Sequence, residues 1–319
     1  MKYRRLGQWG VQVSTIGFGS WLTIRNKGAE LAHRLHRAAY ENGVNFFDTA
    51  NVYGNGETES LVGQSLAPFR RDTFVLATKV FFPYGENPFP GVNDRGLSRK
   101  HIFEQCHHSL RELRTDYVDL YQCHRYDVNA PLHETCRAMN DLIAQGKVLY
   151  WGVSEWTSDQ IREVVSICDE HDWHRPASNQ PVYNMLDRGV EKDILATCAT
   201  LGLGVVVFSP LAQGILTGKY KPGQAPAAGT RAADEKQGQW MRPRMTEENL
   251  RKATDLAKVA EGMGCTASQL ALAWCLRRAE LSSCIVGATK PEQLLENIAA
   301  AEIDLHEAVL DRINMILGV

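Results

Sequence analysis

The sequence lacks several features that would each assign it to a large class of proteins. No stretch of about 18 consecutive apolar residues occurs, and the N-terminus has basic residues but no apolar segment of the signal-peptide kind. The formal charge of −2 gives no basic field of the kind that nucleic acid or an anionic membrane surface selects. We therefore expect a cytoplasmic protein that binds neither nucleic acid nor membrane.

Metal-ligand and disulfide patterns are also missing. The eight cysteines are scattered without a C-x-x-C pair, and most fall in apolar helical or strand-like patterns. The histidine pairs His33/His36 and His171/His174 have no nearby carboxylates or thiols at ligand spacing. We expect buried free thiols, solvated histidines and no metal site.

The phosphate-binding motifs of the common nucleotide folds are absent as well. A doubly wound dinucleotide fold, the competing architecture, would need G-x-G-x-x-G between the first strand and the first helix. The sequence offers only GFGSW there, at residues 17–21, and it has no G-x-x-x-x-G-K-[ST] anywhere. The doubly wound fold is therefore discounted.

A repeated unit runs along the whole chain: a short apolar run rich in β-formers, a turn, and an amphipathic segment of helical period. Strands that alternate with helices indicate a parallel sheet, because a parallel connection needs a crossover element. Eight such units predict one (β/α)₈ TIM barrel domain over residues 1–319. Residues 2–14 look instead like a β-hairpin that plugs one end of the barrel. The eight runs are 15–21, 44–50, 73–80, 117–124, 148–154, 177–184, 204–211 and 284–290.

Polar residues stand at the ends of three of these runs. Asp48 ends the second run, with Tyr53 just beyond it, Lys79 lies near the end of the third and His124 ends the fourth. Strand ends meet at the C-terminal face of a barrel, where active sites lie. Alone, each residue is more often a cap, a surface group or a packed side chain. An ammonium inside an apolar run, however, needs a carboxylate partner, and Asp48 on the adjacent strand is the candidate.

This combination suits the reduction of a carbonyl group. A phenol is a poor proton donor or acceptor at neutral pH unless a nearby cation stabilises its anion. Lys79 would do this for Tyr53, Asp48 would keep Lys79 charged, and His124 would position the reacting oxygen. Such a general acid beside a nicotinamide would complete the reduction. A barrel isomerase or lyase that uses Lys79 as a base or Schiff-base former remains an alternative.

Seven separated segments resemble those of the aldo-keto reductases, in the same order: FFDTANVYGNGETE, LATKV, DYVDLYQCH, GKVLYWGVSEW, NQPVYN, FSPLAQGILTGKY and GATKPEQLLEN. The resemblance covers about residues 3–300 and is greatest to the branch with bacterial reductases and the potassium-channel β-subunits. It implies a (β/α)₈ barrel that binds NADPH in extended form and reduces a small carbonyl substrate to an alcohol. Asp48, Tyr53, Lys79 and His124 match the catalytic tetrad.

The resemblance also implies cofactor contacts. Ser154 and Gln180 match residues that hydrogen-bond the carboxamide, and Tyr183 looks like the ring on which the nicotinamide stacks. The remaining matches are Ser209, Leu211 and Gly214 at the pyrophosphate, Lys219 and Arg231 in a clasp over it, Gly287, Thr289 and Lys290 at the adenosine phosphate, and Gln293, Glu296 and Asn297 around the adenosine. The segment GATKPEQLLEN is also consistent with an ordinary helix N-terminus, which by itself binds anions.

Two departures from the family pattern bear on function. Glu155 stands where many members have Asn, which leaves open whether one carboxamide contact is altered. The channel β-subunits commonly lack the family's histidine, whereas His124 is present here, so turnover is favoured over a slow or non-catalytic regulatory role. The sequence does not disclose the physiological substrate. It leaves the oligomeric state open, although the channel-related branch suggests a homo-oligomer.

Two connecting segments are long for a barrel. Residues 81–98 are rich in aromatics and proline, which suits the wall of a pocket for an apolar carbonyl, although a rigid lid fits nearly as well. Residues 219–245 have the small residues of a mobile flap over the cofactor, or of a disordered insertion.

Overall fold

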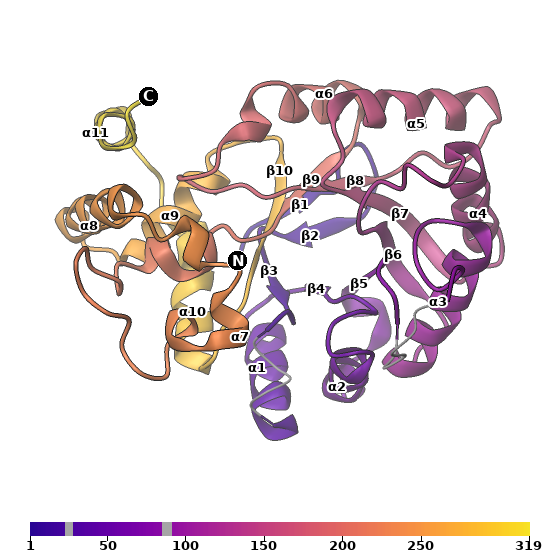
Figure 1. Cartoon of the computed structure of the whole chain (residues 1–319), viewed down its shortest axis with the longest axis horizontal. Helices are drawn as coiled ribbons and strands as arrows, with labels where there is room; N and C mark the ends of the chain where they lie inside the picture. The colour runs from indigo at the N-terminus through magenta and orange to yellow at the C-terminus, as the bar shows by residue number, and fades with distance from the viewer. Residues whose placement is uncertain (23–27, 85–90) are drawn as a thin grey trace.

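The computed structural model describes residues 1–22, 28–84 and 91–319, and it contains a closed barrel of eight parallel strands (Figure 1). Around the barrel the strands follow the order β10-β3-β4-β5-β6-β7-β8-β9, so each hydrogen-bonds to its neighbour in the chain and β10 closes on β3. This confirms the (β/α)₈ prediction. The strands are β3 (Ile16–Gly19), β4 (Phe46–Asp48), β5 (Val75–Val80), β6 (Val118–Cys123), β7 (Val148–Ser154), β8 (Ser178–Gln180), β9 (Gly204–Val207) and β10 (Leu281–Val286).

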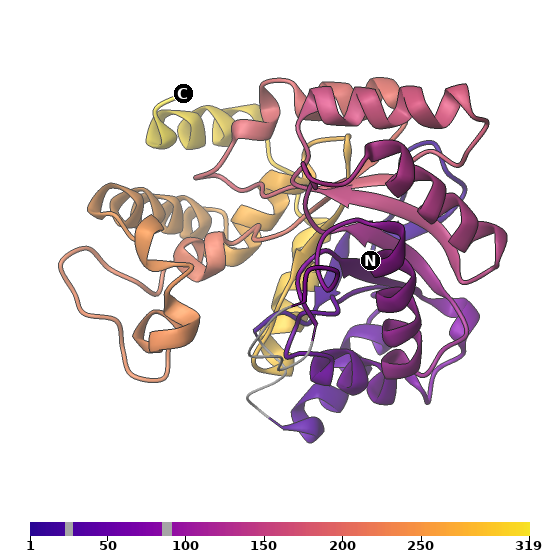
Figure 2. The ribbon, with the colours of Figure 1, turned by 45° about the vertical axis from the view of Figure 1, so that its right-hand side comes forward.

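Helices surround the strands, and their apolar faces form one large core with the outer faces of the strands (Figure 2). Local signals start several of them: Thr157 forms a capping box with Gln160 at α5, and Pro291 takes the first position of α10. The helix α11 packs on α8 at the edge of the molecule. The helices are α1 (Ala29–Glu41), α2 (Glu57–Leu66), α3 (Arg99–Leu113), α4 (Leu132–Ala144), α5 (Ser158–Glu170), α6 (Ile194–Leu201), α7 (Glu235–Gly238), α8 (Glu247–Gly262), α9 (Ala267–Leu276), α10 (Pro291–Ala299) and α11 (Glu307–Leu317).

The first residues form the predicted hairpin, with β1 (Tyr3–Arg5) antiparallel to β2 (Gln12–Ser14). Leu6 and Val13 are fully buried and pack with barrel residues that include Phe46, Leu120 and Val206. At Gly7, φ is +62° and an added Cβ would lie 2.2 Å from the carbonyl oxygen of Gly202, which precedes β9. Only glycine fits this close approach. The hairpin therefore closes the N-terminal end of the barrel, as predicted.

The hairpin is also tied to the last strand and helix. The Arg4 guanidinium donates hydrogen bonds of 2.7–2.9 Å to the carbonyl oxygens of Leu276, Arg278 and Leu281. The Leu276 carbonyl is the last of α9, where helical carbonyls lack partners within the helix, and Leu281 begins β10. These hydrogen bonds fix the N-terminal hairpin to the segment between α9 and β10 at the closed end of the barrel.

Two expectations about side chains have different outcomes. All eight cysteines are free, and all except the half-buried Cys265 are buried, as predicted. His36, in contrast, is not solvated: its ring is buried between Phe18 and Phe47, and Nδ1 lies 2.8 Å from the Ala32 carbonyl oxygen. Burial lowers the pKa of His36 to about 4. The prediction was wrong because position 36 lies on the apolar face of α1, together with Ala32, Leu35 and Ala39.

Candidate active site

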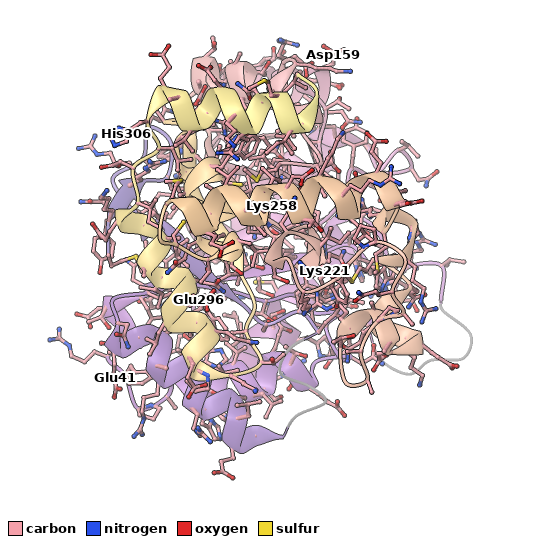
Figure 3. The ribbon with its side chains drawn as sticks, turned by 90° about the vertical axis from the view of Figure 1, so that its left-hand side faces the viewer. Glu41, Asp159, Lys221, Lys258, Glu296 and His306 are labelled. Carbon is pink, nitrogen blue, oxygen red and sulfur yellow. The ribbon has the colours of Figure 1, made fainter. Side chains whose placement is uncertain are left out.

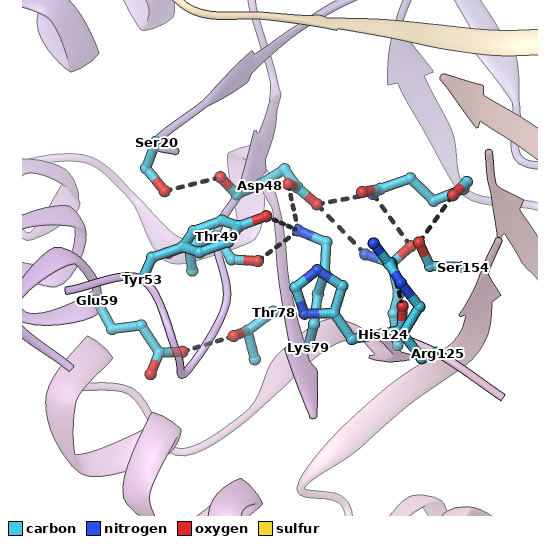
Figure 4. A network of polar contacts seen from close by, with 12 residues as sticks. Ser20, Asp48, Thr49, Tyr53, Glu59, Thr78, Lys79, His124, Arg125 and Ser154 are labelled. Atoms are coloured by element: carbon cyan, nitrogen blue, oxygen red, sulfur yellow. Dashed lines mark hydrogen bonds and ion pairs between the residues drawn. The ribbon is translucent and has the colours of Figure 1, made fainter. Parts of the chain in front are cut away.

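The four predicted catalytic residues converge at the C-terminal ends of β4, β5 and β6 (Figure 4). Asp48 is the last residue of β4, Lys79 is the fifth residue of β5, and His124 directly follows β6. Tyr53 lies in the turn between β4 and α2. The three strands are hydrogen-bonded neighbours, so their polar ends face one region of the barrel mouth.

Lys79 is the centre of this cluster and is completely buried. Its Nζ lies 2.5 Å from Asp48 Oδ1, 2.7 Å from the Thr49 carbonyl oxygen and 3.4 Å from Tyr53 Oη. Burial disfavours the charged form, but the attraction of Asp48 and Tyr53 outweighs burial and raises the pKa of Lys79. The side chain is therefore an ammonium that touches both the carboxylate and the phenol.

The second carboxylate oxygen of Asp48 is held by two amides. Gln180 Nε2 donates to Asp48 Oδ2 at 2.9 Å, and Gln122 Nε2 donates to the same atom at 3.3 Å. Ser154 Oγ donates to the Gln180 carbonyl oxygen at 2.8 Å. Sequence reasoning missed Gln122; the available signal was an amide within the otherwise apolar run that ends at His124.

Tyr53 is held as a neutral phenol. Burial raises its pKa, and this effect exceeds the opposing effect of Lys79, which lowers the pKa. Lys79 therefore lowers the pKa of Tyr53 as expected, but the net shift of that pKa is upward. The ring lies edge-on to His124, with 5.9 Å between ring centroids, and 6.3 Å from the ring of Trp21. The hydroxyl is a protonated group available for donation.

His124 is held as a neutral imidazole. Burial is the largest cause, and the charges of Lys79 and Arg125 also hold the pKa of His124 well below its usual value. Its Nδ1 is buried and has no hydrogen-bond partner among the described residues. The Phe82 ring lies 5.1 Å away, so part of the 81–98 segment does line the site. Residues 85–90 of that predicted wall lie outside the described residues.

The turn after β9 has an unusual backbone. Ser209, Ala212 and Gln213 have φ of 53°, 46° and 57°, a conformation that only glycine adopts without strain, and Gly214 has φ of 104°. The amide nitrogen of Gly214 donates to the Leu211 carbonyl oxygen at 2.8 Å. Strained backbone of this kind is concentrated at functional sites.

Lys219 approaches this turn. A Cβ added at Gly214 would lie 3.5 Å from Lys219 Nζ. The structure therefore brings the first residue of the predicted clasp to the turn that contains all three predicted pyrophosphate residues, Ser209, Leu211 and Gly214.

The 219–245 segment runs from the turn after β9 toward the tetrad; Figure 2 shows it as a long orange excursion from the barrel. It contains 3₁₀ turns at 231–233 and 242–244, with α7 between them. Arg231 is half-buried, and burial lowers its pKa. Farther along, the Trp240 ring lies 6.3 Å from the ring of Trp21, which in turn borders Tyr53.

The junction between β10 and α10 leaves helix N–H groups available. Lys290 is the N-cap residue, and its side chain makes no capping hydrogen bond. The amide nitrogen and the hydroxyl of Thr289 both donate to Gln293 Oε1 at 3.0 Å. Gly287 is exposed. This leaves a lysine, a hydroxyl and a helix N-terminus in one place.

Two of the predicted adenosine residues have other partners. Glu296 Oε1 accepts a hydrogen bond of 2.7 Å from Thr266 Oγ1, the N-cap of α9, and Asn297 is buried in α10. Both residues therefore contribute to the packing of α10 on its neighbour. Glu296 is half-buried and Asn297 is buried, whereas Lys290 is exposed to solvent.

Tyr183 does not lie with the tetrad. It is completely buried, its ring stacks on Trp274, and its hydroxyl donates to Glu191 Oε1 at 2.5 Å. It therefore offers no exposed face on which a nicotinamide could stack. Phe208, which sequence reasoning missed, directly follows β9 and is half-buried. It is the better candidate for such an aromatic surface.

Glu155 occupies a left-handed backbone position, with φ of 61°. Its Oε1 accepts a hydrogen bond of 2.7 Å from the amide nitrogen of Val182. Asn tolerates this conformation better than Glu does, which gives a backbone reason for the Asn expected there.

Neither a metal cluster nor a membrane span is found in residues 1–22, 28–84 and 91–319. No group of three or more His, Cys, Asp or Glu side chains there is arranged to hold a metal ion. No helix in the same residues is long and apolar enough to cross a membrane.

Comparison with known proteins matches the model of the Aldo/keto reductase family to residues 15–317. Proteins from Arabidopsis thaliana and Oryza sativa subsp. japonica, both named "Probable voltage-gated potassium channel subunit beta", are each 41% identical over 323 residues, covering 99% of this chain and 97% of theirs. A relative from Schizosaccharomyces pombe, also named as a voltage-gated potassium channel subunit beta, is 40% identical over 326 residues, covering 99% of this chain and 93% of its own.

Proposed function

The chain belongs to the aldo/keto reductase family, and from this premise we propose that it is an NADPH-dependent oxidoreductase that reduces aldehydes and ketones to alcohols. The observation that carries the proposal is the position of Lys79 Nζ, 2.5 Å from Asp48 Oδ1 and 3.4 Å from Tyr53 Oη. A general acid for carbonyl reduction needs this arrangement, because the phenolate left after proton transfer must be stabilised.

Each residue of the tetrad has one role in this proposal. Tyr53 donates its proton to the carbonyl oxygen, and Lys79 stabilises the resulting phenolate. Asp48 keeps Lys79 charged and oriented. His124, as a neutral imidazole, donates a hydrogen bond to the same oxygen and so positions the carbonyl.

The residues at the mouth fit a dinucleotide that carries phosphates. Bound NADPH supplies the hydride for the carbonyl carbon. Ser154 and Gln180 would hold its carboxamide, and Phe208 would border the nicotinamide. The turn at 209–214, with Lys219 and Arg231, would hold the pyrophosphate. Thr289, Lys290 and the N-terminus of α10 would hold the adenosine phosphate, because free helix N–H groups favour anions.

The proposal is tested by mixing the purified protein with NADPH and a simple aldehyde. Quenching of protein fluorescence measures cofactor binding, and loss of NADPH absorbance measures turnover. Binding together with multiple turnovers supports the reductase. An isomerase or lyase that works through Lys79 would show neither binding nor NADPH consumption.

The alternative is a slow or non-catalytic nicotinamide-binding regulatory subunit. The names of the relatives from Arabidopsis thaliana and Oryza sativa subsp. japonica favour it. It predicts tight NADPH binding with turnover no faster than cofactor exchange. Because such subunits act in assemblies, light scattering of the purified chain would test whether it forms the homo-oligomer that this alternative requires.

A further inference from the structure

Arg125 directly follows His124 at the end of β6 and has no role in the mechanism above. Figure 4 shows the two side chains next to each other at the tetrad. Arg125 is half-buried, its Nη1 donates to the His124 carbonyl oxygen at 2.6 Å, and its Cζ lies 5.7 Å from the centroid of the Phe82 ring. A guanidinium has several further N–H donors. None of these has a carboxylate partner within residues 1–22, 28–84 and 91–319.

The carboxylates of the neighbouring segments are already in use. Asp48 binds Lys79 and two amides. Asp127 accepts from the amide nitrogens of Leu97 and Asn129. Both carboxylates are therefore engaged by other groups, and no ion pair joins Arg125 to a carboxylate within residues 1–22, 28–84 and 91–319.

The other site groups contribute no net charge. Lys79 and Asp48 cancel each other as an ion pair. Burial keeps Tyr53 protonated, and burial with the nearby cations keeps His124 neutral. Beside these four groups, the described residues place the positive charge of Arg125.

We propose that Arg125 binds an anionic group of the substrate, so that the preferred substrates are short carbonyl compounds carrying a carboxylate or a phosphate. This rests on the proposed reductase function. The planar fork of a guanidinium matches both anions in a bidentate manner, and partial burial strengthens the contact. The ring of Phe82, which lies beside Arg125, and the ring of Trp21, which borders Tyr53, would hold the carbon chain. The competing explanation is that Arg125 only braces the backbone of His124.

Matched substrate pairs separate these explanations. One pair is 4-carboxybenzaldehyde and its uncharged amide, 4-carbamoylbenzaldehyde; the other is glycolaldehyde phosphate and glycolaldehyde. The measured quantity is the ratio of kcat/KM within each pair. We expect the parent to prefer the charged member of at least one pair, and that pair identifies the anion as carboxylate or phosphate.

The variant Arg125→Met should lower this ratio by about 10- to 100-fold, as expected for the loss of a charge-assisted contact. Arg125→Lys should retain an intermediate ratio because it keeps the charge without the fork. Arg251→Met, on the exposed side of α8, controls for the change in total charge and should keep the parental ratio.

Two results overturn the proposal: a parent that does not prefer the charged member of either pair, or equal losses for both members in Arg125→Met. The parental measurement does not depend on the folding of any variant. Failure of the reductase function is seen separately, because the parent would then bind NADPH without consuming it with any of the four aldehydes.

Discussion

At the scale of single residues, Tyr53 combines two properties that its immediate sequence does not reveal together. Burial keeps its hydroxyl protonated, and the Lys79 ammonium lies 3.4 Å away to stabilise the anion. In the proposed reaction, such an acid would keep its proton until a carbonyl oxygen accepts it. Lys79 would then stabilise the transition state more than the resting state of the phenol.

Replacement of Tyr53 by Phe should abolish most turnover while leaving NADPH binding largely intact. The hydroxyl supplies the proton, whereas the ring packs against Trp21 and His124 in either protein. General acids usually contribute roughly 10²- to 10⁴-fold to the rate. Steady-state kinetics and cofactor titration on both proteins measure the two effects. A variant that keeps more than about a tenth of the parental turnover would show that another group is the acid.

His36 gives a pH dependence of stability whose sign can be worked out. Its folded pKa of about 4 lies below the ordinary value of 6.5, so the folded state disfavours the charged form. The stabilisation is present above pH 6.5 and is lost as the pH falls from 6.5 toward 4. The total loss is about 3 kcal/mol.

Thermal unfolding of the parent and His36→Gln at several pH values tests this. The variant has no charge to gain, so its stability should fall less steeply than that of the parent between pH 6.5 and 4. Glu59 and all other titrating groups are shared, and the difference between the two curves isolates His36. Parallel curves would contradict the assignment.

At the scale of elements, sequence reasoning succeeded where the signal is local. The strands were predicted because apolar β-rich runs recur, and the convergence of Asp48, Lys79 and His124 was predicted because they stand at the ends of three such runs. Tyr53 was predicted to join them because it lies in the turn that directly follows the run ending at Asp48. The last strand was placed slightly late, since it spans Leu281–Val286 rather than 284–290.

The errors and omissions depend on contacts between elements. The predicted strand 177–184 leaves the sheet after Gln180. Tyr183 therefore lies outside the barrel sheet, where its ring is buried against Trp274. Gln122 on β6 reaches Asp48 on β4 across the one strand between them, and the burial of His36 needs Phe18 and Phe47 from β3 and β4. None of these partners is near in the sequence, so periodicity alone does not identify them.

The β10–α10 junction should determine the preference for NADPH over NADH. Lys290, Thr289 and the free N–H groups of α10 would meet a 2′-phosphate, which NADH lacks. A charge-assisted contact is worth about 1.5–3 kcal/mol, so Lys290→Ala should weaken NADPH binding by roughly one to two decades. NADH binding should hardly change.

Dissociation constants of both cofactors, measured by fluorescence, decide the question. Figure 3 shows Lys258 on α8, a separate helix from α10, and Lys258→Ala serves as the matched control because it removes an exposed ammonium elsewhere. Equal losses for NADPH and NADH, or a parent that binds NADH as well as NADPH, would remove the 2′-phosphate assignment.

At the scale of the whole molecule, the barrel mouth divides into two arcs. The tetrad lies on β4, β5 and β6 together with the turn before α2, whereas the proposed cofactor residues follow β7, β8, β9 and β10, which are consecutive around the barrel. The 219–245 segment connects the arcs, since Lys219 lies near Gly214 in one arc and Trp240 lies near Trp21, which borders Tyr53 in the other. The hairpin closes the opposite end, where it packs against barrel residues such as Phe46, Leu120 and Val206.

This division predicts where NADPH will protect the backbone from hydrogen exchange. Binding at about 100 times the dissociation constant adds about 2.7 kcal/mol to the stability of the whole chain. Local protection should be added to this at residues 209–219, 230–240 and 287–293, because these segments would contact the phosphates directly. The hairpin at 3–14, which lies at the other end, serves as the internal control and should gain no local protection. If exchange slowed equally in the hairpin and in the turn at 209–214, or slowed around the tetrad without slowing at 287–293, the extended cofactor path across β9 and β10 would be incorrect.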